Sequence, residues 1–521
     1  MMATATRSRS RKGRSRATLH LHKPTGEISR RVQAVGPERF GIVAVDCAKA
    51  RSKWMLADFY GRVLVPPTTV EHTRPGLQQA VELVRLTAHE QGLTEVLVAV
   101  ERTGNYHRPV QRAFATAGFE TRVVHPFATK QFRQPANPGD KTDDHDLAAI
   151  HRATVVGFGL IESPSGESYR GLRLRVRHRR DLVRKCAAIQ CQIREHLELM
   201  LPGFAALFDD GLWIWPLALG IARRVTTPSE ILAHGAAGLK TLLAAAEIRC
   251  QERSLQKVIA WAQQAAAPDP DAALHQRILA DLDDDRRGKV RQIQAQELEI
   301  AAGLAGTPYV LLMAIPGINV VSAGDFAGEM GPIPHYANAN AISGRAGLFP
   351  SRHQSDTVDR AGKIVRSANK RLRAALMCIA DNLLSVNSYF KGQRALWTAQ
   401  RVDARLQRTR VAKRFTRLAY AMVAGTQIVT HDCCRLPSYV LDKLVAFHLE
   451  RAAPAEMLQA ALDAAARQVP VTAHAREREG LQQRIAQLRT ARKPGLKPIG
   501  ELIGEVLAKR LGVHVQSTPE A

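Results

Sequence analysis

The sequence predicts an α/β domain close to the N-terminus, followed by a long region that is mainly α-helical. Two short β-branched runs, residues 40–46 and 96–101, have the length of buried strands, and each ends in an acidic residue. From about residue 163 to residue 307, apolar residues recur at helical spacing and strand signals are few. With 521 residues and 45% hydrophobic content, the chain can form about two to four domains with cores of their own.

The α/β domain is expected to open with three antiparallel strands. Residues 40–46 form the first, and the turn sequence Tyr60-Gly61-Arg62 separates the second from the third. A helix then leads into the strand at residues 96–101, and helices and strands alternate from there on. This order of elements is that of an RNase H-like fold. The elements expected after the first strand are strands at 54–59 and 63–65, a helix at 76–91, a strand at 96–101, a helix at 108–117, a strand at 121–124 and a helix at 142–153.

Four acidic residues occupy special positions in this arrangement. Asp46 and Glu101 end two strands that lie side by side and parallel in a sheet of this order. Asp143 and Asp146 are three residues apart in the first turn of the last helix, so they share one face. Carboxylates gathered in this way are ligands for a divalent cation, here Mg²⁺ or Mn²⁺, facing a phosphate. Taken singly, Asp143 or Asp146 could cap a helix, and Glu101 could pair with Arg102.

The charge balance favours a polyanionic partner. Lysine and arginine number 74 against 48 acidic residues, which gives a formal net charge of +26. Nucleic acid is the first candidate for such a partner, and an anionic membrane surface is the second. No run of about 18 apolar residues and no apolar signal-peptide core is present, so we expect a cytoplasmic protein without membrane insertion.

The flanking regions divide the chain further. Residues 1–37 begin with a low-complexity arginine and serine run and are expected to form a disordered basic tail, either a phosphate-binding arm or a solvated terminus. Residues 161–308 form a helical or coiled-coil arm, which Pro202, Pro216 and Pro268 should break into a hairpin or bundle. This arm either packs on itself or assembles subunits. Residues 431–521 are expected to be a helical extension without chemistry of their own.

Residues 309–430 carry the second group of candidate residues. The Pro316-Gly317 turn suits either a phosphate-binding hairpin or a plain interhelical turn. Ser355 lies in an expected turn-rich loop at residues 347–356, where its hydroxyl can meet a phosphodiester. A basic run at residues 401–417 is either a helix along a nucleic-acid backbone or a solvated face. The cations expected to bind nucleic acid after Ser355 are Arg360, Lys363, Arg366, Lys370, Arg371 and Arg373.

Taken together, these motifs resemble those of the DEDD transposases of the insertion-sequence 110 family, which includes the Piv-type DNA invertases. The resemblance implies a RuvC-like domain at residues 38–160, joined through the arm to a separate, helical transposase domain at residues 309–430. The matching pieces, in order, are Val45-Asp46-Cys47-Ala48-Lys49, Val100-Glu101-Arg102-Thr103-Gly104-Asn105-Tyr106, Lys141-Thr142-Asp143-Asp144-His145-Asp146, Ile315-Pro316-Gly317-Ile318, Ala346-Gly347-Leu348-Phe349-Pro350 and Ser367-Ala368-Asn369-Lys370-Arg371-Leu372-Arg373.

The resemblance also implies roles for these residues. Asp46, Glu101, Asp143 and Asp146 would be both catalytic residues and metal ligands, and Ser355 would be the nucleophile that becomes linked to DNA. Relatives recombine double-stranded DNA under direction of a structured RNA from the element itself, as dimers that pair into tetramers. Asp356 replaces the glycine that usually follows the family's serine, which makes Ser351 the alternative nucleophile.

The function expected from the sequence is therefore that of a DNA transposase or site-specific recombinase. It would exchange strands by phosphodiester transesterification, with each broken bond stored as a serine ester. Two alternatives stay open at this point. One is a RuvC-like metal-dependent junction nuclease that uses water as the nucleophile, and the other is a catalytically inactive scaffold that only binds nucleic acid.

Overall fold

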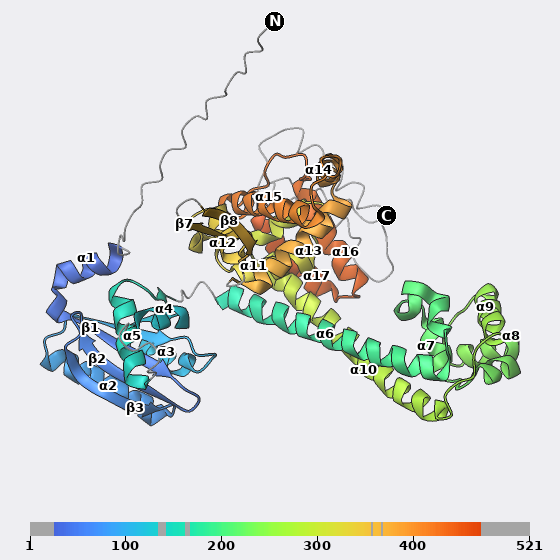
Figure 1. Ribbon diagram of the computed structural model, residues 1–521, viewed down its shortest axis with the longest axis horizontal. Coiled ribbons are helices and arrows are strands. Elements are labelled where there is room, and N and C mark those ends of the chain that lie inside the picture. The colour runs from blue at the N-terminus through green and yellow to red at the C-terminus, as the bar shows by residue number, and fades with distance from the viewer. Residues whose placement is uncertain (1–25, 134–141, 162–166, 356–357, 366–367, 470–521) are drawn as a thin grey trace, which may run out of the picture. The chain divides into compact units, whose positions relative to one another are not determined.

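The computed structural model describes residues 26–133, 142–161, 167–355, 358–365 and 368–469. They divide into two compact units, one up to residue 164 and the other from residue 165 (Figure 1). The first unit is a mixed α/β sheet domain and the second is mostly helical, which confirms the coarse fold class that the sequence predicts. The first 25 residues of the expected basic tail and the extension beyond residue 469 lie outside the described residues.

The first unit is built on a six-stranded sheet with the strand order β3-β2-β1-β4-β5-β6. Its central strand, β1 (Phe40–Cys47), pairs antiparallel with β2 (Arg51–Asp58) and parallel with β4 (Glu95–Glu101). Each predicted strand is present, although the strand predicted at residues 63–65 continues to residue 71. The remaining strands are β3 (Val63–Glu71), antiparallel to β2, β5 (Glu120–Val124), parallel to β4, and β6 (Leu160–Ile161), antiparallel to β5.

Helices cover both faces of this sheet. Because side chains alternate along a strand, Val43 and Val45 of β1 join the apolar core under two helices, while Ile42 and Ala44 join the core on the opposite face. The first face is covered by α2 (Arg74–Glu90) and α3 (His107–Thr116), and the second by α1 (Gly26–Val35), α4 (Pro126–Phe132) and α5 (Asp143–Val155).

The prediction that residues 1–37 form a disordered tail is wrong for residues 26–37. Residues 26–35 form α1, followed by a 3₁₀ turn at Pro37–Arg39. Ile28 and Val32 lie one helical turn apart and are buried in the core of the sheet, which offsets the entropy cost of ordering this segment. Arg31 also forms ion pairs with Glu95 and Glu120, at 2.7 and 2.8 Å.

The second unit begins with two long helices that pack along each other, α6 (Glu167–Met200) and α10 (Ala272–Ala305). They correspond to the helical hairpin expected from the sequence, since Pro202, Pro216 and Pro268 all fall between them. A small cluster of helices with an apolar core of its own lies at the far end of the pair (Figure 1). It consists of the 3₁₀ segment Phe204–Trp213, α7 (Pro216–Ala222), α8 (Pro228–Ala244) and α9 (Glu252–Ala262).

The rest of the second unit is a helical body with one large apolar core. The start of α6 and the end of α10 contribute Leu172 and Ile300 to this core, and the last helices contribute Leu441 and Leu462. The expected boundary at residue 430 therefore does not separate two cores. The body contains the 3₁₀ segments Pro308–Ala314 and Ile333–His335, α11 (Val320–Met330), α12 (Ala339–Ala346), α13 (Lys370–Val386), α14 (Ser388–Ala399), α15 (Ala404–Gly425), α16 (Pro437–Glu450) and α17 (Ala455–Gln468).

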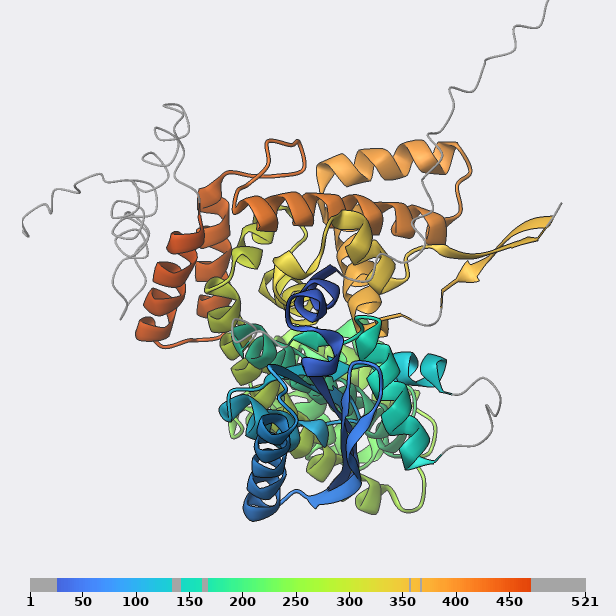
Figure 2. The same cartoon turned by 90° about the vertical axis from the view of Figure 1, so that its left-hand side faces the viewer.

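One antiparallel ribbon interrupts the helices of this body. Strands β7 (Pro350–Ser355) and β8 (Val358–Ile364) pair only with each other and project away from the helices (Figure 2). Among the described residues, no single helix has the length and apolarity needed to cross a membrane, although α10 together with the 3₁₀ segment after it, bent by 106°, would pass that test.

Candidate active site

The sheet places Asp46 and Glu101 next to each other. Strands β1 and β4 are parallel and in register from Phe40 to Val45, where Val45 pairs with Val100, so the two acidic residues follow at the same edge. Because side chains alternate between the two faces of a strand, Asp46 is on the same face as Ala44, and Glu101 is on the same face as Ala99. Both carboxylates therefore face the side covered by α5. Glu101 is only 7% exposed, and Asp46 is partly buried.

Helix α5 brings the other two acidic residues to the same face of the sheet. Thr142 caps its N-terminus by accepting a hydrogen bond from the amide of His145, which fixes where the first turn begins. That turn carries Asp143, which is exposed, and Asp146, which is 2% exposed. The unpaired amides at a helix N-terminus favour negative charge there, and they partly offset the cost of burying Asp146.

The four predicted carboxylates influence one another electrostatically. Burial raises the pKa of Asp46 to about 6, and the negative charges of Glu101, Asp146 and Asp143 add to this rise. Residues that are far apart in the sequence, from two strands and one helix, are therefore close neighbours in the folded unit. A cluster of like charges such as this is costly to a fold and is typical of a functional site.

Arg133 is a member of the cluster that the sequence did not reveal. It caps the C-terminus of α4, and its guanidinium forms a two-pronged ion pair with Asp146 in which Nη2 lies 3.1 Å from Oδ2 and Nε bonds Oδ1. The charges of Asp146, Glu101 and Asp46 raise the pKa of Arg133. No spacing in the sequence marks this residue, because α4 itself was not predicted and its approach to α5 is a tertiary contact.

The chemistry of the four carboxylates fits a divalent cation, although they do not form a complete coordination site. Oxygen donors of this charge are what Mg²⁺ and Mn²⁺ select, and three excess negative charges remain after Arg133 is counted against four ionised carboxylates. Across the described parts of the chain, no three acid, histidine or cysteine side chains are grouped closely enough to enclose an ion. The assignment of the four residues as metal ligands stays a prediction.

Ser355 lies in a strand and not in the turn-rich loop that its sequence predicts. It ends β7 and pairs with Val358 across the ribbon, where it is exposed. Hydrogen bonds between the two strands pair backbone groups that would bind water in a loop, and this pairing explains why the segment is a strand. Ser351, the alternative nucleophile, lies at the other end of β7 against Gly362, and Asp356 lies outside the described residues.

The six cations after Ser355 do not form a uniform group. Arg360, Lys370 and Arg371 are exposed, as a nucleic-acid contact requires. Arg373 has a structural contact instead, because its guanidinium donates to the carbonyls of Ala346, at 2.8 Å, and of Val365, which ties the base of the ribbon to α12. Arg366 and the side chain of Lys363 lie outside the described residues.

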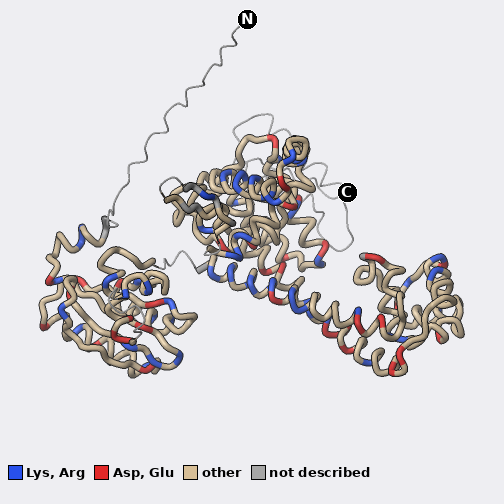
Figure 3. Tube along the Cα trace, viewed as in Figure 1, with Lys and Arg blue, Asp and Glu red and all other residues tan. Residues whose placement is uncertain are grey.

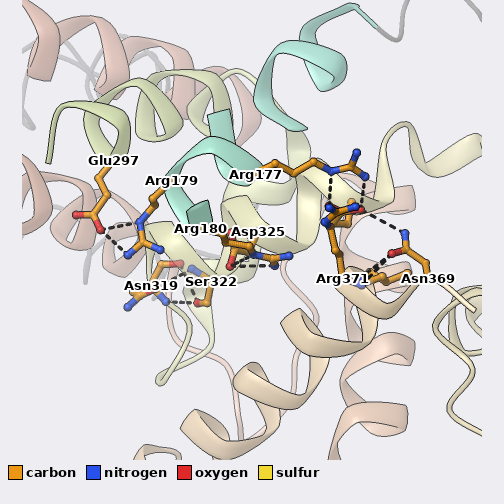
Figure 4. Close-up of polar contacts among 11 residues, drawn as sticks. Arg177, Arg179, Arg180, Glu297, Asn319, Ser322, Asp325, Asn369 and Arg371 are labelled. Carbon is orange, nitrogen blue, oxygen red and sulfur yellow. Dashed lines mark hydrogen bonds and ion pairs between the residues drawn. The ribbon is translucent and has the colours of Figure 1, made fainter. Parts of the chain in front are cut away.

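The residue before Lys370 anchors this segment to the helical body. Asn369 caps α13 by accepting hydrogen bonds from the amides of Arg371 and Leu372, both at 3.1 Å. Its Nδ2 also donates to Glu329 of α11, whose carboxylate is paired in turn with Arg177 of α6 (Figure 4). The start of α13 is therefore fixed to both α11 and α6.

The second basic run coincides with α15. Lysine and arginine positions are frequent along the traces of α6, α13 and α15 (Figure 3). Arg410 and Arg414 of α15 stack on the ring of Trp397, with the guanidinium carbons 5.7 and 5.0 Å from the ring centroid. Arg408 is paired with Asp381, so this run is part solvated face and part internal contact.

The Pro316-Gly317 turn packs inside the helical body. The ammonium group of Lys443 donates hydrogen bonds to the carbonyls of Met313, Ile315 and Ile318, at distances of 2.8 to 3.3 Å. A Cβ atom on Gly317 would lie 3.0 Å from the backbone oxygen of Asn382. These contacts favour the plain interhelical turn over a phosphate-binding hairpin.

Comparison with known proteins agrees with this arrangement of motifs. A transposase family model of the IS110 DEDD type matches residues 43–202, and the model of the transposase IS116/IS110/IS902 family matches residues 309–395. The chain is similar to the IS110 family of transposases in both matched segments. A relative from Pseudomonas aeruginosa, described as a probable family 20 transposase, is 23% identical over 339 residues, which cover 64% of this chain and 85% of the relative.

The similarity to this family gives the acidic cluster and the ribbon a common context. The first match includes all four carboxylates and the second includes Ser355. An IS110 transposase binds DNA, and its activity in general terms is to cut and recombine DNA. Members of a DEDD transposase family usually depend on a divalent metal ion, and the carboxylate cluster has suitable donors for one.

Proposed function

We propose that this IS110-family transposase exchanges DNA strands by serine-mediated, metal-assisted transesterification. The observation that supports this most strongly is the gathering of Asp46, Glu101, Asp143 and Asp146 at one sheet edge, where the pKa of Asp46 is raised to about 6. The strand order β3-β2-β1-β4-β5 also supports the RNase H-like, RuvC-like interpretation of the first unit. In that interpretation the four carboxylates hold Mg²⁺ or Mn²⁺.

The chemistry assigned to Ser355 is a balanced exchange of one phosphoester for another. Its hydroxyl loses a proton and forms an Oγ–P bond, while one deoxyribose oxygen leaves the same phosphorus and takes up a proton. A sugar hydroxyl of the second strand then reverses these steps, which frees the serine and rejoins the DNA. Because each step replaces one phosphodiester with another, the exchange is close to neutral in free energy and needs no external energy source.

Other side chains position the DNA. Arg360, Lys370 and Arg371 are exposed close to Ser355 in sequence and can hold the phosphate backbone by charge-assisted hydrogen bonds. A divalent cation held by the carboxylates would polarise the scissile phosphate and neutralise charge that develops on it. The serine itself is a weak nucleophile at neutral pH and depends on this assistance.

The direct test is to trap the covalent adduct between protein and DNA. The chain is incubated with DNA carrying the joined ends of its own element and with RNA transcribed from the flanking non-coding DNA. We expect Ser355→Ala to abolish the adduct seen on denaturing gels, while Ser351→Ala retains it. An adduct of wild-type amount from Ser355→Ala would refute this assignment, and its loss only in Ser351→Ala would move the role to Ser351.

The same experiment addresses the proposed partners. We propose a structured guide RNA and an assembly of dimers that pair into tetramers, because the motifs of this chain resemble those of IS110 transposases that work in this way; the net charge of +26 suits polyanionic partners. RNA that copurifies with the chain, and a mass measured by light scattering with and without DNA, test both proposals. A chain that purifies without RNA and recombines DNA in its absence would contradict the guided mechanism.

Two alternatives make different predictions for the same assay. The carboxylates all lie within one compact unit, which favours a metal-dependent junction nuclease that cuts with water and leaves free ends. The pairing of Asp146 with Arg133 favours an inactive scaffold, whose DNA binding would survive Glu101→Gln and a chelator. Rejoined strands would exclude both alternatives.

A further inference from the structure

The side chain of Arg133 is turned into the carboxylate cluster. Its guanidinium approaches both carboxylate oxygens of Asp146, and that aspartate side chain is only 3% exposed. The guanidinium also lies in the field of Glu101 and Asp46. A single cation therefore faces three of the four carboxylates that the proposed function assigns to a metal.

A divalent cation and this guanidinium need the same oxygen atoms. A carboxylate that accepts two parallel hydrogen bonds from arginine has its most accessible lone pairs occupied, whereas Mg²⁺ demands oxygen ligands at about 2.0–2.1 Å in near-octahedral geometry. The two cations would also repel each other strongly at a separation of a few ångströms in a partly buried site. Asp146 therefore cannot bind the guanidinium and the divalent cation with all of its contacts at the same time.

From this geometry we propose that Arg133 is an internal counter-ion that competes with the divalent cation for Asp146. Binding of the cation displaces the guanidinium, and loss of the cation allows it to return. Arg133 thereby neutralises part of the carboxylate cluster while no metal is bound, and it lowers the affinity of the site for metal. This inference rests on the proposed metal-binding role of the four carboxylates.

Arg152 provides a matched control for the loss of an arginine. It lies in α5 beside the same α4, and its Nη1 donates to the carbonyl of Phe132 at 3.4 Å. An Arg152→Gln variant therefore loses one positive charge from the same pair of helices and leaves the pairing of Asp146 with Arg133 in place. Any effect that is specific to Arg133→Gln then comes from the cluster itself.

The test is calorimetric titration of Mn²⁺ into the full chain without DNA. We expect Arg133→Gln to bind Mn²⁺ at least tenfold more tightly than the unaltered protein, and Arg152→Gln to stay within twofold of it. In a chelator, Arg133→Gln should also melt at a lower temperature, and Mn²⁺ should raise its melting temperature by more than it raises that of the unaltered protein. If Arg133→Gln bound Mn²⁺ with an affinity equal to or weaker than that of the unaltered protein, the inference would be overturned.

A second variant covers the case in which Arg133→Gln does not fold. Arg133→Lys keeps the charge but cannot form the two-pronged contact, so we expect it to bind Mn²⁺ several-fold more tightly. If the unaltered protein binds Mn²⁺ and Arg133→Lys gives no gain, the competition proposed here is wrong and the metal site stands. If neither the unaltered protein nor any variant binds Mn²⁺ or Mg²⁺, the metal-assisted function fails and this inference fails with it.

Discussion

Both units of this protein bury carboxylates, but they balance the charge in different ways. In the helical unit, Glu297 is paired with Arg179 at 2.6 Å (Figure 4). It is also paired with Arg451 at 2.7 Å, and Glu329 is paired with Arg177. Asp283 of α10 is surrounded more fully still, by three arginines of which Arg223 and Arg286 lie at 2.9 and 2.7 Å. Each of these carboxylates has at least one guanidinium of its own.

The acidic cluster of the sheet unit lacks this balance. Three of the four clustered carboxylates lie in the field of one guanidinium, that of Arg133. Burial raises the pKa of Asp46 to about 6, and the neighbouring negative charges add to this rise. By contrast, hydrogen bonds and charge from Arg177 lower the pKa of Glu329 although burial opposes this shift. Burial alone therefore does not set the direction of the shift, because the cations near each carboxylate also contribute to its pKa.

The largest expected effect separates activity from stability. Glu101→Gln should reduce strand joining by about 10³-fold or more, because it removes charge from the cluster proposed to hold the metal. The same change should leave the melting temperature unchanged or higher, since it relieves repulsion between like charges. Rates of strand joining and thermal melts of the same preparations measure both effects.

Asp144 provides the control for this prediction. It lies between Asp143 and Asp146 in the sequence, but it is exposed and paired with Lys53 at 2.7 Å. We expect Asp144→Asn to lower joining less than threefold. Equal losses in Asp144→Asn and Glu101→Gln would show that general charge, and not the cluster, sets the rate.

The next largest effect concerns the balanced acids. Glu297→Gln should lower the free energy of unfolding of the helical unit by about 3 kcal/mol, because it leaves Arg179 and Arg451 without their shared charge partner. Glu299, two residues further along α10, pairs with Arg175 at 3.3 Å while both side chains are more than two-fifths exposed. Glu299→Gln should therefore cost less than 1 kcal/mol.

Hydrogen exchange followed by mass spectrometry measures this pair of variants within the helical unit. Peptides from α6 and α10 report the opening of these helices without interference from the sheet unit. Loss of protection confined to Glu297→Gln is the expected outcome. Equal protection in the two variants would mean that the buried ion pairs do not stabilise this packing.

The sequence allowed the sheet to be predicted better than the contacts between its helices. The strand order and the positions of Asp46 and Glu101 follow from the alternation of side chains along a strand and from the rule that parallel strands end at the same edge of a sheet. Both signals can be recognised within short segments of the sequence. Arg133 was missed because its role depends on how α4 approaches α5, a contact that no periodicity encodes. Arg373 was assigned to nucleic acid on charge alone, whereas its guanidinium holds carbonyls at the base of the ribbon.

The ribbon and α1 show the same limit. The segment around Ser355 is rich in polar residues, so it was interpreted as a loop, and only its pairing with Val358–Ile364 makes it a strand. Ile28 and Val32 are two apolar residues in a basic stretch, too few to predict a helix before the core they enter is known. In both segments, tertiary contacts determine the secondary structure, although the local sequence does not predict it.

The smallest expected effect is a dependence of stability on pH that has opposite signs in the two units. The pKa of Asp46 is raised from its ordinary value of 3.8 to about 6, so the folded sheet unit holds this proton more tightly than the unfolded chain does. Its contribution to stability is present below about pH 4 and is lost as the pH rises through 6, at a cost of about 1–3 kcal/mol. The lowered pKa of Glu329 has the reverse effect, since its contribution is lost as the pH falls below its ordinary value of 4.5.

The difference between variants isolates the contribution of Asp46. Between pH 4.5 and 7, protection of peptides from β1 and β4 should fall with rising pH in the unaltered protein relative to Asp46→Asn, which has no proton to lose. Asp144→Asn should follow the unaltered protein, and peptides from α11 should show no such fall. Parallel curves for the unaltered protein and Asp46→Asn would mean that the carboxylates of the sheet unit are as well balanced as those of the helical unit, and the contrast between the two units would then be lost.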